Sequence, residues 1–130
     1  MVKSKIVVAA LMLVFSTMPA FAAPGDMLAS TFLEKADRLM AMGVRAMFSG
    51  DVKVLMAEGK GAGEAYRLRM VADKAAGRPP HSCAPPRTRM NSDQLLNHLR
   101  SYPPAQRQST TMKVAMADYF ARTYPCPRAG

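Results

Sequence analysis

The chain of 130 residues has few aromatic side chains: four tyrosines, five phenylalanines and no tryptophan. It also lacks any basic run, because its eighteen lysines and arginines are scattered singly although the formal net charge is +9. Proteins that bind nucleic acids combine clustered basic residues with aromatic platforms on which bases stack. The sequence therefore argues against a nucleic-acid partner. Its positive charge fits an acidic protein partner, an anionic envelope surface or solubility alone.

The one long apolar run covers residues 6–15, which is too short to span a bilayer as a lasting helix. Two lysines precede this run, and the Ala-Phe-Ala at 20–22 follows it with the small-x-small pattern of a signal-peptidase site. We therefore predict a signal peptide at residues 1–22, no stable membrane span and a periplasmic location. Residues 23–130 are then a single domain with sixteen basic and nine acidic residues, a net charge of +7.

Cysteine is equally scarce, with Cys83 and Cys126 the only two. In an oxidising compartment an even number of cysteines normally forms bridges, so we predict a Cys83–Cys126 disulfide with Cα atoms about 4.4–6.8 Å apart. Closing this loop would stabilise the domain by roughly 4 kcal/mol. Two free, buried cysteines in a cytosolic protein are the alternative.

No segment long enough to form a β-strand alternates apolar and polar residues, so the sequence does not predict a sheet. Capping residues, glycines and prolines instead mark the ends of helices. The predicted fold is all-α, a small domain of about four helices with one disulfide. The segment 23–29 is predicted to be a loose arm, and the proline-rich residues 78–89 an extended linker. The predicted helices cover residues 31–43, 51–77, 91–102 and 110–123.

The second helix contains an apolar seam with two glycines, Gly59 and Gly63, at helical spacing. Their missing side chains would let a neighbouring helix approach closely. We therefore expect Gly63→Leu to destabilise the fold by about 1–3 kcal/mol through overpacking.

No arrangement of residues points to catalysis or to a cofactor. Residues 59–63, Gly-Lys-Gly-Ala-Gly, lack the spacing and the ending of a phosphate-binding loop. His81 and His98 could join Cys83 in a metal site or a Cys–His pair, but a disulfide removes the thiolate that either needs. The methionines could bind cuprous copper, yet they fall on apolar helical faces that suit core packing. The sequence thus predicts no enzyme, no cofactor and no metal.

The C-terminal part of the chain resembles the Rap/Tai family over residues 82–127. The resemblance rests on a cysteine-x-proline element at 83–85, a short leucine-rich helix, a proline-bearing turn at 102–103 and an alanine-rich helix closed by Tyr-Pro-Cys at 124–126. Members of this family are exported immunity proteins that protect bacteria from type VI secretion effectors, notably enzymes that cut peptidoglycan peptides. The resemblance implies a non-catalytic protein that binds and neutralises a secreted cell-wall-degrading effector.

Three exposed arginines near the predicted disulfide, Arg87, Arg89 and Arg100, are candidate partner-binding residues, because guanidinium groups bind carboxylates in bidentate fashion. Ordinary solvated charge is the alternative for each of them. A different class of function is also open: a general periplasmic helper or acid-stress chaperone that exposes apolar surface at low pH.

Overall fold

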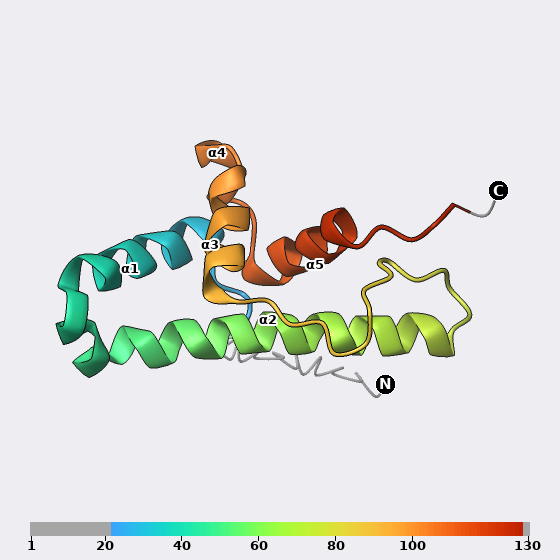
Figure 1. Ribbon diagram of the computed structural model, residues 1–130, viewed down its shortest axis with the longest axis horizontal. Coiled ribbons are helices and arrows are strands. Elements are labelled where there is room, and N and C mark those ends of the chain that lie inside the picture. The colour runs from blue at the N-terminus through green and yellow to red at the C-terminus, as the bar shows by residue number, and fades with distance from the viewer. Residues whose placement is uncertain (1–21, 129–130) are drawn as a thin grey trace, which may run out of the picture.

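The computed structural model describes residues 22–128 (Figure 1). All but the last residue of the predicted signal peptide, 1–22, lies outside these described residues. Between 22 and 128 the chain forms five α-helices and one 3-10 helix, with no strand beyond a single bridge, which confirms the all-α prediction. The elements are α1 (Ala29–Met42), η1 (Gly43–Phe48), α2 (Gly50–Ala75), α3 (Ser92–Ser101), α4 (Pro104–Arg107) and α5 (Met112–Thr123).

The long helix α2 is the base of the domain. In Figure 1, α1 folds back above its first half, α5 lies above its second half, and α3 rises between them. Each of these four helices contributes apolar side chains to one core, whose burial is the main driving force for folding. The core consists of Ala29, Phe32, Leu33, Ala36, Leu55, Ala62, Tyr66, Leu99, Tyr102, Met112, Ala115 and Met116.

Local signals predicted the start of α3 correctly. The side chain of Asn91 accepts from the N–H of Gln94 at 2.8 Å, and the side chain of Gln94 accepts from the N–H of Asn91 at 2.9 Å. This capping box satisfies two N–H groups that have no partner within the helix. Pro103 follows the helix, and α4 after it is a single turn that was not predicted.

The start of α1 was predicted two residues too late. Thr31 and Glu34 have the spacing of a capping box, but they do not cap α1, because the helix already begins at Ala29. The N–H of Ala29 donates to the carbonyl of Thr110 at 2.8 Å, so a residue distant in sequence satisfies the helix end.

The segment 23–28 is not a loose arm, contrary to the prediction. The N–H of Lys113 donates to the carbonyl of Gly25 at 2.9 Å, and the carboxylate of Glu58 accepts from the N–H of Gly25 at 2.6 Å. The ammonium of Lys113 bonds to Asp26 at 2.7 Å, which lowers the pKa of that carboxyl below its usual value. These contacts hold the segment against α2 and α5.

The glycines of α2 act differently from the prediction. The helix runs unbroken through them, and its buried residues are Leu55, Ala62 and Tyr66. A Cβ on Gly63 would meet no described atom within 4 Å, whereas a Cβ on Gly61 would lie 2.5 Å from the Cβ of Pro24. The close approach is therefore at Gly61, against the segment 23–28. The premise of the overpacking expected for Gly63→Leu, that this position faces another helix, is therefore wrong.

Candidate functional site between α2 and the disulfide linker

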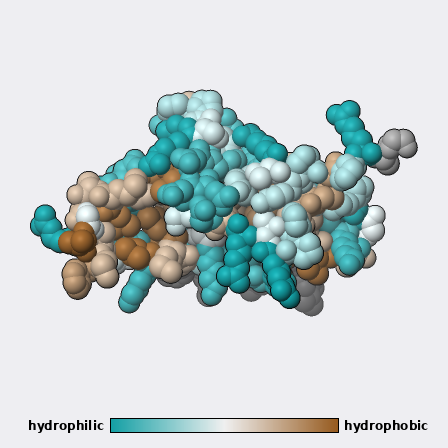
Figure 2. Space-filling view, viewed as in Figure 1, coloured by the Kyte–Doolittle hydropathy of each residue, from teal (hydrophilic) through white to brown (hydrophobic). Residues whose placement is uncertain are grey.

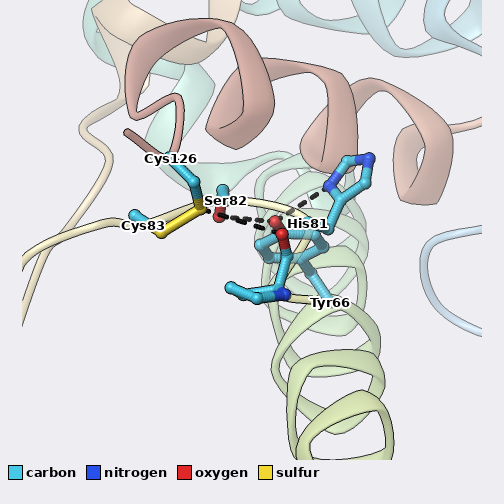
Figure 3. Close-up of a disulfide and its surroundings, with 6 residues drawn as sticks. Tyr66, His81, Ser82, Cys83 and Cys126 are labelled. Atoms are coloured by element: carbon cyan, nitrogen blue, oxygen red, sulfur yellow. Dashed lines mark hydrogen bonds between the residues drawn. A yellow bond between two sulfur atoms is a disulfide. The ribbon is translucent and has the colours of Figure 1, made fainter. Parts of the chain in front are cut away.

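The predicted disulfide is present: Cys83 and Cys126 are bonded, with Cα atoms 4.8 Å apart (Figure 3). Beside it, the N–H of Cys83 donates to the carbonyl of Tyr124 at 2.8 Å. The bridge thus fastens the linker to the chain immediately after α5. In the structure this linker extends to residue 91, just before α3.

Tyr66 of α2 connects the same linker to the core. Its hydroxyl lies 2.6 Å from the Oγ of Ser82 and 3.1 Å from the Nδ1 of His81 (Figure 3). Its ring stacks on Phe120 of α5 with ring centroids 5.0 Å apart. Tyr66 and Ser82 are buried, so their hydrogen bond satisfies two hydroxyls that would otherwise be costly to bury. Three segments of the chain are therefore joined at one tyrosine.

Past the disulfide, the linker and α2 enclose an open groove of about 710 Å³. Gly59 and Gly63 lie on the α2 side of this groove, and their missing side chains leave it open. Its other lining residues are Glu64, Tyr66, Arg67, Met70, Ser82, Ala84, Pro85, Arg87, Thr88, Arg89, Met90, Met116 and Phe120.

A tight turn places arginines along the linker side of the groove. The N–H of Thr88 donates to the carbonyl of Pro85 at 3.3 Å, and its hydroxyl bonds to the same oxygen at 2.5 Å. Arg87, inside this turn, has φ of +63°, the only positive φ among the non-glycine residues of the described chain. Residues other than glycine rarely adopt this left-handed backbone conformation, and those that do often occur at binding sites.

The groove carries excess positive charge. Arg67 is neutralised by Glu64, with N–O distances of 2.6 and 3.0 Å, and this pairing lowers the pKa of the Glu64 carboxyl. Arg87 and Arg89 are exposed, and neither forms an ion pair with any residue between 22 and 128. Two guanidinium groups are therefore available to an anionic ligand.

The structure brings together two of the three predicted partner-binding arginines. Arg87 and Arg89 both line the groove, whereas Arg100 of α3 lies elsewhere and pairs with Asp37 of α1 at 2.7 Å. Arg67 was missed because its spacing from Glu64 is that of an ordinary surface pair. The glycine spacing on α2 was the signal that could have located the groove.

The two histidines lie in separate places. His98 packs between α3 and α5, where its Nε2 is 2.8 Å from the carbonyl of Ala115. That oxygen can only accept, so Nε2 carries the proton, and burial lowers the pKa of the ring. Tyr102 lies 3.2 Å from the same nitrogen and donates to Asp118 at 2.5 Å. This network connects two helices.

Residues 22–128 contain no group of three or more His, Cys, Asp and Glu side chains that could hold a metal ion. In the same part of the chain no helix is both long and apolar enough to cross a membrane.

Compared with known proteins, the chain matches no family model, no curated protein and no solved structure. The fold and the groove consequently rest on this chain's own residues. Membership of the Rap/Tai family stays a hypothesis.

Proposed function

We propose that this protein is a non-catalytic binding protein that holds an acidic segment of a protein partner in the groove between α2 and the linker. One observation carries the proposal: the groove is lined by Arg67, Arg87 and Arg89 but by a single acid, Glu64, among the described residues. Guanidinium groups bind carboxylates with two parallel hydrogen bonds, which provides geometric specificity as well as attraction.

The rest of the lining suits a peptide better than a free anion. Met70, Met90, Met116 and Phe120 supply apolar surface beside the arginines. Methionine side chains adapt to irregular partners, and aromatic side chains provide rigid contact area. A volume of about 710 Å³ lies in the range of ligand-binding clefts. An acidic segment that also carries apolar side chains would contact both the arginines and the apolar side chains of the groove.

The resemblance over residues 82–127 supports a more specific role. It includes the cysteine-x-proline element and the linker that carries Arg87 and Arg89. We propose that the partner is a secreted cell-wall-degrading effector, which the protein neutralises in the periplasm by binding an acidic surface loop. Activity would then come from surface shape and charge, without chemistry.

Binding in the groove is tested with the oxidised protein and a fluorescein-labelled peptide of alternating glutamate and leucine. The fluorescence anisotropy of the peptide measures its binding. Arg87→Glu combined with Arg89→Glu should weaken binding by about tenfold or more, with a marked salt dependence. Arg45→Glu combined with Lys53→Glu is the matched control. It changes the net charge equally, at exposed residues that do not line the groove. Equal weakening by both pairs would mean that only overall charge matters.

The effector role is tested by co-expression in the periplasm with a secreted peptidoglycan amidase. The wild-type protein and a Lys74→Glu/Arg128→Glu control, which makes the same charge change at exposed residues outside the groove, should protect the cell, and the Arg87/Arg89 variant should not. Deleting residues 1–22 should abolish protection, because antidote and effector would then occupy different compartments. If the peptide binds as expected but no secreted enzyme is inhibited, the groove proposal stands and the effector role falls, in favour of a periplasmic helper.

A further inference from the structure

The corner between α1 and α2 exposes large apolar side chains. Val44, Met47 and Phe48 of η1 are 81%, 80% and 90% exposed. Figure 2 shows hydrophobic side chains gathered at this end of the molecule. Exposed apolar residues that occur singly need no explanation, but a contiguous cluster marks an interaction surface. Met40, Met42, Val54 and Met56, on the flanking helices, are also exposed.

The corner is a defined structure. Gly43, with φ of +59°, ends α1, and the hydroxyl of Ser49 accepts from the N–H of Asp51 at 3.2 Å to cap α2. Between them the chain forms a 3-10 helix, in which side chains three residues apart line up. Val44 is thereby aligned with Met47, and Arg45 with Phe48.

The charge around the corner is positive. Arg45 and Lys53 are exposed and form no ion pair with any residue in the described range 22–128. The nearby acid Asp51 is already paired with Lys35, at 2.9 Å. The apolar cluster is therefore accompanied by two positive charges that no described residue neutralises.

We propose that this corner, formed by η1 and the flanking ends of α1 and α2, docks onto the surface of an anionic lipid bilayer. Apolar side chains enter the boundary between headgroups and acyl chains, and basic side chains contact the phosphates. A second copy of the chain fits the corner less well, because a symmetric contact would bring together two patches that both carry the positive charges of Arg45 and Lys53. The site is separate from the groove and leaves it free for a protein partner.

The absence of tryptophan provides a direct test in the full chain. Phe48→Trp places a single fluorescent indole at the corner, and Val114→Trp places one at a site on α5 that is 51% exposed. With phosphatidylglycerol vesicles, emission from the corner indole should shift to the blue and be quenched by lipids brominated on their acyl chains. The α5 indole should show neither effect. Position-specific quenching separates the corner from any insertion by residues 1–21.

The basic residues are tested in the same background. Arg45→Gln combined with Lys53→Gln should lower partitioning of the corner indole onto anionic vesicles by roughly 10- to 30-fold at low salt. Equal quenching of both indoles, or no quenching at the corner, overturns the proposal. A blue shift without lipid that grows with protein concentration also overturns it, in favour of a second copy.

Discussion

A methyl group on Gly61 would lie 2.5 Å from the Cβ of Pro24 and 2.6 Å from its carbonyl oxygen. The segment before α1 therefore packs directly on the backbone of α2 and needs a residue without a side chain there. Gly63, two residues further on, faces open space in the described chain because it lines the groove. Two glycines of one short sequence thus have different roles, one in packing and one in leaving a cavity.

Gly61→Ala should destabilise the protein by about 1–3 kcal/mol, because the added methyl group must displace the segment that contains Pro24. Gly63→Ala is the matched control, and it should stabilise by about 0.5–1 kcal/mol through the higher helix propensity of alanine. Urea unfolding of the two variants measures both effects. Equal stabilisation by both substitutions would show that the segment does not pack on Gly61.

Gly63→Leu should weaken peptide binding without lowering the stability of the fold. The leucine side chain enters the groove, so the free energy of unfolding should stay the same or rise slightly. Binding of the acidic peptide should fall because the groove is partly filled. Unfolding and anisotropy measured on one preparation test both points. A large loss of stability would mean that the groove is closed in solution.

His98 should make the protein less stable in mild acid. Burial lowers the pKa of its ring in the folded state, so the unfolded state binds the proton more readily. The contribution is present above about pH 6.5 and is lost as the pH falls toward the lowered folded pKa. His98→Gln keeps an N–H that can reach the carbonyl of Ala115 but does not titrate. As the pH is lowered from about 7.5 to about 5, the free energy of unfolding should fall more for the wild type than for the variant. Parallel curves would contradict this role.

Removing the disulfide should cost roughly 2–4 kcal/mol, since the bridge closes a long loop with a sequence separation of 43. Replacing Cys83 and Cys126 by serine together avoids leaving a reactive thiol. Denaturant unfolding gives the loss, and alkylation of the native wild-type protein should find no free thiol. The peptide should bind the variant more weakly, because the linker that carries Arg87 is then held less firmly to the chain after α5. Two alkylated thiols in native wild-type protein would exclude the bridge.

Local sequence determined much of the helical structure. The cap at Asn91 and the stop at Gly43 act within a few residues, so they could be recognised without knowledge of the fold. The disulfide was predictable for a different reason: there was only one possible pairing.

What depended on distant residues could not be predicted. The first N–H of α1 donates to the carbonyl of Thr110, and Pro24 packs on α2 at Gly61. From the apolar spacing, Gly59 and Gly63 were assigned to a helix–helix contact. A glycine packed against a neighbour and a glycine beside a cavity cannot be distinguished by sequence alone.

The candidate site was predicted in part. Arg87 and Arg89 could be singled out because they follow Cys83 in a proline-rich linker. That they share a groove with Arg67, and that Arg100 does not, follows from the path of the linker along α2. The sequence by itself determined the helices, the bridge and the positive charge, because these depend on neighbouring residues or on composition. Only the tertiary structure decided which charges are neutralised and which are available, because ion pairs form between residues that folding brings together.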